Sequence, residues 1–278
     1  MTSALLRPAL GELGSGGHVC AVIDSEQDRK ELAGRFVRDG LAADERVWYL
    51  TATTAPSQLL DLIRADDLDV DGALRRGQLA VLSSDDSYPR KPSFDPQAAV
   101  DMMNAAVDDA LAAGYAGFRV TGEMSWSRRE ACGTDRLLEY ERLIGDLLEN
   151  RPAAAICQYD RAMFPEPTLS EVLDVHPQCW SRRSQQMSIR PLTERVGLRI
   201  DGEVDLCTHG TLRRALAGLP DAGEVHLDLG GLTFIDVAGV GALAELAAPP
   251  RVVVLRSPPP EIRQISKLLW PDLEWRIE

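Results

Sequence analysis

Short apolar runs alternate with amphipathic segments over residues 18–180, and this alternation limits the possible folds more than any other feature of the chain. The runs that predict strands are residues 18–24, 46–52, 79–84, 117–124 and 153–160. The segments between them predict helices, which begin near residues 25, 56, 97 and 135. Most runs are apolar throughout, which is typical of parallel strands covered on both faces. We therefore expect an α/β domain over residues 18–180 with helices on both sides of a parallel sheet.

The pattern changes after a polar stretch, residues 180–186, that predicts a linker. The predicted elements are a pair of strands at 187–191 and 196–202, a helix at 208–219, a strand at 224–229, a turn at Gly230-Gly231, a helix at 240–246, a strand at 252–255 and a helix at 261–270. This order indicates a second, smaller α/β domain over residues 186–278. Residues 1–17, which end in a Gly/Ser run, predict a mobile leader.

The composition limits the partners that the chain can bind. Forty-three acidic and 30 basic residues give a formal net charge of −13. An acidic surface repels nucleic-acid phosphates and anionic lipid headgroups, so we expect neither nucleic acid nor a membrane as a partner. No apolar run has the length of a membrane span, and the N-terminus lacks a secretory signal pattern. The chain is therefore expected to be cytoplasmic.

The turn after the first predicted strand is where a nucleotide-binding domain would carry its phosphate loop. Such a loop needs glycines for close backbone approach and a lysine to meet the phosphates. Residues 24–28 instead contain no glycine and three acidic side chains, and Lys30 lies too far into the helix. We expect no nucleotide at this turn and assign no cofactor.

Histidines and cysteines of the first domain offer a possible metal site. His18 and Cys20 lie on the same face of one predicted strand, Cys157 lies on another, and His176 and Cys179 follow later. Thiolate and imidazole are natural ligands of zinc and haem iron. Their spacing matches no common zinc motif, however, and a buried histidine bonded to a backbone carbonyl is the commoner case. We therefore assign no metal ligands and leave open whether these residues converge.

Carboxylates and aromatic residues mark the carboxyl ends of two predicted strands, where parallel-sheet domains place functional groups. Glu123 ends one strand with Trp126 close behind it, and Tyr159 and Asp160 end another. Together they predict a small-ligand pocket. The alternative is that Glu123 caps a helix or forms a salt bridge with a nearby arginine. The sequence contains no GxSxG motif and no histidine close to a candidate serine. It therefore gives no sign of a hydrolytic nucleophile.

Several sequence blocks of the first domain carry a resemblance to a known family. They are HVC at 18–20, DGLAADERVWYL at 39–50, RRGQLAVL at 75–82, SYPRKPSFDP at 87–96, GYAGFRVTGEMSW at 114–126, EYERLI at 139–144, ICQYD at 156–160 and HP at 176–177. In this order they resemble the MEDS family, the sensory domain of methanogen and methylotroph regulators. That family looks like a relative of RecA-like ATPase domains, which implies a RecA-like sheet with a degenerate phosphate loop. It also implies the sensing of a small organic ligand, and His18, Glu123, Trp126 and Tyr159 lie in the family's blocks as predicted ligand contacts.

Two blocks of the second domain, LRIDGEVDL at 198–206 and VHLDLGGLTFIDVAGVGAL at 225–243, resemble STAS domains, the fold of anti-sigma-factor antagonists. In that family an Asp at a strand end precedes a Ser or Thr that a partner kinase phosphorylates. Here Asp236 precedes Val237, Ala238 and Gly239, so no hydroxyl is present to be modified. The resemblance implies that residues 236–239 bind an anti-sigma factor or a related regulatory kinase. The alternative is a strand–helix junction whose apolar residues only pack in the core.

The sequence as a whole predicts a non-enzymatic cytoplasmic signalling regulator. In this hypothesis the first domain senses a small ligand and the second binds the partner without the usual phosphorylation switch. One alternative is a nucleotide-hydrolysing enzyme of RecA-like descent, which would need a phosphate site that residues 24–28 do not provide. The other is a scaffold in which both domains bind only proteins.

Overall fold

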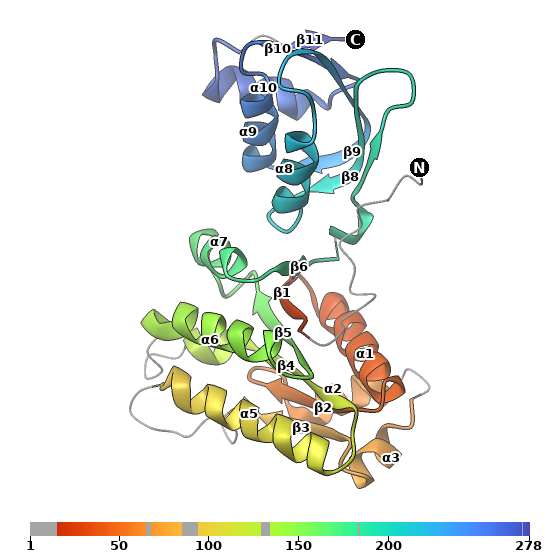
Figure 1. The fold of residues 1–278 in the computed structure, drawn as a ribbon, viewed down its shortest axis with the longest axis vertical. Coiled ribbons are helices and arrows are strands. Elements are labelled where there is room, and N and C mark those ends of the chain that lie inside the picture. The colour runs from red at the N-terminus through yellow and green to blue at the C-terminus, as the bar shows by residue number, and fades with distance from the viewer. Residues whose placement is uncertain (1–15, 65–67, 85–93, 129–133, 183, 274) are drawn as a thin grey trace. The chain divides into compact units, whose positions relative to one another are not determined.

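The computed structural model describes residues 16–64, 68–84, 94–128, 134–182, 184–273 and 275–278 (Figure 1). The chain divides into two compact units, with the division between Cys179 and Trp180. Except for its last two residues, the predicted leader at 1–17 lies outside the described residues. Among the described helices, none is long and apolar enough to cross a membrane.

The first unit is built on a six-stranded sheet with the strand order β3-β2-β4-β5-β1-β6. Its elements are β1 (His18–Ile23), α1 (Glu26–Ala42), β2 (Glu45–Thr51), α2 (Pro56–Arg64), α3 (Val70–Arg75), β3 (Leu79–Ser83), α5 (Pro96–Ala112), β4 (Gly117–Glu123), a 3₁₀ turn (Met124–Arg128), a second 3₁₀ turn (Thr134–Arg136), α6 (Leu137–Glu149), β5 (Ala153–Asp160), α7 (Glu166–Asp174) and β6 (Gln178–Trp180). The pairings β3–β2, β2–β4, β4–β5 and β5–β1 are all parallel. The predicted α/β class is therefore confirmed.

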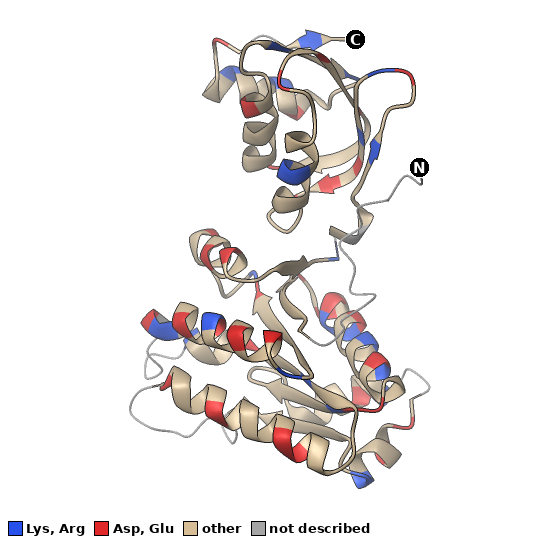
Figure 2. Cartoon of the chain, in the orientation of Figure 1, with Lys and Arg blue, Asp and Glu red and all other residues tan. Residues whose placement is uncertain are grey.

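The central strands are covered on both faces, as their uniformly apolar sequences predict. Every residue of β1 is buried, and seven of the eight residues of β5 are buried. Helix α1 begins where the sequence predicts, because the Ser25 side chain caps it by accepting a hydrogen bond from the Asp28 amide at 3.2 Å. Charged residues lie mainly on helices such as α1, α5 and α6, whereas the strands carry few (Figure 2). This distribution leaves the sheet as the core of the unit.

The second unit contains a five-stranded sheet with the order β11-β10-β9-β8-β7. Its elements are a 3₁₀ turn (Ser184–Gln186), β7 (Ser188–Pro191), β8 (Gly197–Val204), α8 (His209–Ala217), β9 (Gly223–Ile235), α9 (Val237–Leu246), β10 (Arg251–Arg256), α10 (Pro260–Leu269) and β11 (Arg276–Ile277). Strands β7 and β8, the predicted pair, are antiparallel, and the other pairings are parallel. The smaller α/β domain is therefore confirmed.

The predicted turn at Gly230-Gly231 is wrong, because β9 continues through both glycines to Ile235. The register between β8 and β9 shifts in this region, which is typical of a β-bulge. A Cβ atom at Gly231 would lie 1.8 Å from Asp201 Oδ1, so the residue must be glycine for the strands to approach. The two glycines thus mark an irregular strand and not a chain reversal.

Candidate functional site

The most unusual feature of the first unit is a group of ionisable side chains buried between the sheet and helices α6 and α7. His18 comes from β1, Glu141 from α6, Cys157 from β5 and His176 from the turn that follows α7. All four are buried, and one ligand-type atom from each lies within 4.8 Å of those of the other three. Three residues that the sequence marks as possible metal ligands, His18, Cys157 and His176, therefore do converge. Glu141, at which the group is centred, is not among the residues that the sequence marks.

Glu141 Oε2 is the common neighbour within this group. It lies 3.3 Å from His18 Nε2, 3.4 Å from His176 Nε2 and 3.3 Å from Cys157 Sγ. Tyr159 donates its hydroxyl to the other carboxylate oxygen, Oε1. We name these five residues the Glu141 cluster. It brings together two of the predicted ligand contacts, His18 and Tyr159, through a residue that contacts both.

The protonation of the cluster follows from its burial. Burial is the largest influence on the pKa of Glu141 and raises it, but the charges and hydrogen bonds of His176 and His18 outweigh it and hold that pKa well below its usual value. Burial, followed by the neighbouring Glu141 charge, raises the pKa values of Cys157 and Tyr159 well above their usual range. Burial also lowers the pKa of His18. At neutral pH, in the absence of a bound cation, a carboxylate is therefore surrounded by a protonated thiol and a protonated phenol.

The position of Glu141 has a local signal in the sequence of α6. The buried residues of this helix are Leu137, Tyr140, Glu141, Ile144 and Leu148, which recur every three or four positions. A glutamate in the apolar stripe of an amphipathic helix must find polar partners inside the protein, since an isolated buried carboxylate is strongly unfavourable. That requirement could have pointed to Glu141 from the sequence alone.

Glu123 lies on the opposite face of the sheet, apart from the Glu141 cluster. Its Oε2 atom accepts hydrogen bonds from the backbone amides of Ala52, Thr53 and Thr54 at 2.9, 2.7 and 3.1 Å, and from the Thr53 hydroxyl at 3.0 Å. These donors belong to the segment that follows β2. Glu123 therefore joins the carboxyl ends of β4 and β2, and this carboxylate oxygen is engaged by the chain itself.

The ion pair of Glu123 is formed with Arg29 of α1. Arg29 Nη1 lies 3.3 Å from Glu123 Oε1, and Arg29 Nη2 lies 3.2 Å from Asp160 Oδ2. Burial is the largest influence on the pKa of Glu123 and raises it, but the hydrogen bonds from residues 52–54 and the charge of Arg29 outweigh it. The pKa of Glu123 is consequently lowered, and the side chain is ionised at neutral pH.

A chain of neutral hydrogen bonds lies on the same face of the sheet as Glu123. The Gln158 side-chain amide donates to the Thr121 hydroxyl at 2.8 Å, and the Tyr49 hydroxyl donates to Gln158 Oε1 at 3.1 Å. The Thr121 hydroxyl in turn donates to the Ile156 carbonyl at 2.9 Å. Buried polar groups of three neighbouring strands are satisfied in this way.

Trp126, the fourth predicted ligand contact, belongs to an aromatic group. It lies in the 3₁₀ turn after β4 and is buried. Its ring centroid is 4.6 Å from that of Phe94 and 6.3 Å from that of Tyr140, the residue before Glu141. The structure thus distributes the four predicted contacts over the Glu141 cluster, the Glu123 ion pair and this aromatic group. Their roles as ligand contacts stay predictions.

In the second unit, Asp236 caps the N-terminus of α9. Its Oδ1 atom accepts a hydrogen bond from the Gly239 amide at 2.8 Å and lies 2.7 Å from His209 Nε2. Val237 is 53% exposed, Ala238 is also exposed, and Gly239 is buried. The predicted partner-binding residues therefore form a capped helix start with two apolar side chains facing solvent and a glycine packed against the sheet.

We expect Gly239→Ala to lower the free energy of unfolding of the second unit by about 1–3 kcal/mol, the usual effect of overpacking. A Cβ atom at Gly239 would lie 2.7 Å from both Ile235 Cγ1 and Val204 Cγ1. Gly210→Ala in α8 is the matched control, because its added methyl would meet only Arg214 Nη1 at 3.5 Å. Chemical denaturation of both variants measures the effect, and equal stabilities would contradict the prediction.

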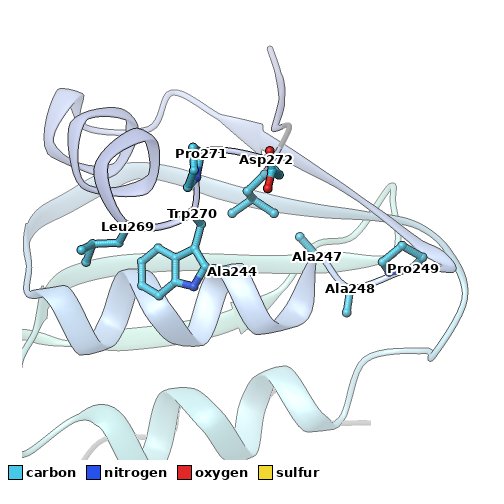
Figure 3. A pocket seen from close by; sticks show the side chains of 9 residues that line it. Ala244, Ala247, Ala248, Pro249, Leu269, Trp270, Pro271 and Asp272 are labelled. Carbon is cyan, nitrogen blue, oxygen red and sulfur yellow. The ribbon is translucent and has the colours of Figure 1, made fainter.

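A shallow hollow also lies in the second unit, beside the C-terminal ends of α9 and α10 (Figure 3). It is lined by Ala244, Ala247, Ala248, Pro249, Leu269, Trp270, Pro271, Asp272 and Leu273. Asp272 is the only charged residue in this lining, so the hollow offers few groups that could orient a polar ligand. We assign no site to it.

Comparisons with known proteins agree with this two-unit organisation. Residues 17–177 match the family described as "MEDS: MEthanogen/methylotroph, DcmR Sensory domain", and residues 187–269 match the family described as "Mlab, STAS domain". The fold and these matches define a protein with a regulatory sensory domain followed by a STAS domain. The chain belongs to the MEDS family, and both resemblances found in the sequence are confirmed. None of the curated proteins compared with the chain matches it.

Solved structures also show similarity to the chain. One is the flagellar accessory protein FlaH from Methanocaldococcus jannaschii, with 11% identity and a TM-score of 0.46, covering 68% of this chain and 87% of that one. Another is a KaiC-like protein from Pyrococcus horikoshii, with 12% identity and a TM-score of 0.46, covering 68% of this chain and 88% of that one.

Proposed function

We propose that this chain is a non-enzymatic signalling regulator in which residues 18–180 sense a small organic ligand and residues 186–278 bind an anti-sigma factor or a related regulatory kinase. His18, Glu123, Trp126 and Tyr159 are the proposed ligand contacts, and residues 236–239 are the proposed docking site. A signalling role follows from the sensory and STAS domains joined in one chain. The ligand, the partner and the absence of catalysis are the further steps of the proposal.

The observation that carries the docking proposal is the apolar, exposed start of α9. Val237 and Ala238 face solvent at the position where antagonists of the STAS type carry their phosphorylatable residue. Because Asp236 already accepts from the Gly239 amide, the helix end is ordered without a partner. An ordered apolar surface can bind a partner with little loss of conformational freedom, and no phosphate can be added at Val237 to disrupt it. Control of docking is therefore assigned to the sensory domain.

The turn between β1 and α1 supports a role without nucleotide hydrolysis. A phosphate loop needs free backbone N–H groups at this turn. Here the Asp24 amide donates to Asp28 Oδ2 at 3.1 Å, and the Asp28 amide donates to Ser25 Oγ at 3.2 Å. The Arg161 guanidinium also pairs with Asp24 at 2.5 Å. The turn is thus occupied by the chain's own carboxylates and hydroxyl, which take the place that a phosphate would need.

We expect Val237→Asp to weaken partner binding at least about thirtyfold, the effect of losing a central interface residue. The new carboxylate would have to be buried without a counter-charge in an apolar contact. A photo-crosslinker at position 237 of the full-length chain first identifies the partner by mass spectrometry. Isothermal titration calorimetry with that purified partner then measures the affinity of each variant.

Val252→Asp is the matched control, since Val252 is 40% exposed on β10 of the same unit. It introduces the same charge away from α9 and should leave the affinity within about threefold of the original, as surface changes outside an interface do. Equal affinities for Val237→Asp and the unmodified chain would contradict the docking site. A crosslinked partner that is neither an anti-sigma factor nor a kinase would contradict the proposed partner class.

A further inference from the structure

The geometry of the Glu141 cluster is that of a metal site. The atoms of these residues that approach one another are His18 Nε2, Glu141 Oε2, Cys157 Sγ and His176 Nε2. The measured separations are 3.3, 3.4 and 3.3 Å from Glu141 Oε2 to the other three atoms, and 3.6 Å between Cys157 Sγ and His18 Nε2. A tetrahedral zinc ion with its usual bond lengths holds its ligand atoms roughly 3.3–3.7 Å apart. Four of the six separations among these atoms therefore already have the length that one tetrahedral ion requires, and the four residues offer ligand-type atoms that all lie within 4.8 Å of one another.

The tautomer of His176 supports a cation at this position. His176 Nδ1 lies 2.6 Å from the Val172 carbonyl oxygen, which can only accept, so Nδ1 carries a proton. In a neutral imidazole the lone pair is then on Nε2, which lies 3.4 Å from Glu141 Oε2. A lone pair directed at a carboxylate is unfavourable. Either a second proton or a metal ion must lie between them.

Charge balance favours the metal ion. A divalent ion bound by one thiolate, one carboxylate and two neutral imidazoles gives a site of zero net charge, which suits full burial. The side chains of Glu141 and His176 are 0% exposed and that of His18 is 2% exposed. Without a metal, the same burial would have to hold an imidazolium ion beside the carboxylate.

We propose that His18, Glu141, Cys157 and His176 bind one divalent metal ion of the zinc class. One sulfur, two nitrogens and one oxygen are ligands that suit zinc, whereas magnesium and calcium prefer oxygen alone. Four protein ligands close the coordination shell and leave no position for a reactive water, so the ion has a structural or sensory role and not a hydrolytic one. The Glu141 cluster shares His18 and Tyr159 with the proposed ligand contacts, but the metal ion is inferred from the geometry and not from the proposed function of the chain.

Neighbouring residues hold the ligands in place as they do in known metal sites. The Val172 carbonyl fixes the tautomer of His176, and the Tyr159 hydroxyl donates to Oε1 of Glu141, whereas the other ligands contact Oε2. Such outer contacts orient metal ligands, and losing one commonly weakens metal affinity by about 10–100-fold. Tyr159 is therefore a positioning residue of the site.

The test uses the full-length chain, produced without an affinity tag in medium supplemented with Co²⁺ or Zn²⁺. Elemental analysis and native mass spectrometry should find about one ion per chain, as a single closed site requires. The cobalt-loaded chain should show the absorption of tetrahedral Co²⁺ and a charge-transfer band from a thiolate. A folded chain that binds neither ion would overturn the proposal.

Cys157→Ser should abolish the thiolate band, whereas Cys20→Ser should keep it. Cys20 is the matched control because it is a free, buried cysteine that pairs with Cys157 across β1 and β5 but is not one of the four ligands. If Cys157→Ser does not fold, Tyr159→Phe replaces it and should keep the band while weakening Co²⁺ affinity about 10–100-fold. An unchanged band in Cys157→Ser, or unchanged affinity in Tyr159→Phe, would count against the site. Neither result bears on partner binding at Val237.

Discussion

Replacing Glu141 with alanine should lower the free energy of unfolding of the first unit by about 3–5 kcal/mol, the usual result of removing one partner from a buried ionic network. The substitution leaves the Tyr159 hydroxyl, the Cys157 thiol and the imidazole of His18 without their common acceptor. Each unsatisfied buried group costs about 1–3 kcal/mol, and the deleted side chain leaves a cavity as well. Urea denaturation in the presence of a chelator measures this effect independently of any metal.

The control for this measurement is Glu149→Ala at the end of the same helix. Glu149 is exposed, so its removal should change stability by less than about 0.5 kcal/mol. The comparison separates the loss of a buried acceptor from the general effect of placing alanine in α6. A loss of less than about 1 kcal/mol in Glu141→Ala would show that Glu141 does not organise its neighbours.

Replacing Glu123 with glutamine should lower the free energy of unfolding by about 2–4 kcal/mol at pH 7, because charged hydrogen bonds and a buried ion pair are lost. The pKa of Glu123 in the folded state lies below its usual value. In the unfolded chain, the pKa of a glutamate is about 4.3. The stabilisation by the carboxylate is therefore fully present above about pH 5. It is lost as the pH falls through the folded pKa.

The difference in stability between the unmodified chain and Glu123→Gln should accordingly stay constant between about pH 5 and 8 and shrink below about pH 4. Denaturation curves across this range measure it. Glu31→Gln on the exposed side of α1 is the control and should show a small difference at every pH. A difference that grows in acid would mean that the carboxylate is not stabilised in its ionised form.

The elements of the first unit can be predicted closely from the sequence, because each depends on local signals. Strand β5 spans the predicted residues 153–160 at both ends, and α1 begins after the Ser25 cap. Helix α3 (Val70–Arg75) escapes prediction, since six residues are too few to display a helical period. The glycine pair at 230–231 is ambiguous in the sequence because a bulge and a turn require the same freedom of the backbone.

The sites are only partly predictable from the sequence, because some of the groups that contact each site residue have no distinctive residue type. Histidine and cysteine draw attention by their chemistry, so the sequence alone is enough to consider His18, Cys157 and His176 together. The partners of Glu123 carry no such signal, since three of them are backbone amides that any sequence would supply. The ion pair between Glu123 and Arg29 has no signal in the sequence either, because it depends on where α1 crosses the sheet.

The alternation of side chains along β5 has a consequence for how the sheet assembles. The strand is buried on both faces and begins with three alanines and an isoleucine, so a slip of one residue would change its hydrophobic contacts little. The same slip would move the Cys157 thiol to the side of Tyr49 and Thr121 and bring the Gln158 amide among the imidazoles. Two adjacent polar residues thus give β5 one favourable alignment with its neighbours. The chemistry that makes the unit a candidate sensor therefore also favours one register of β5 with β1 and β4.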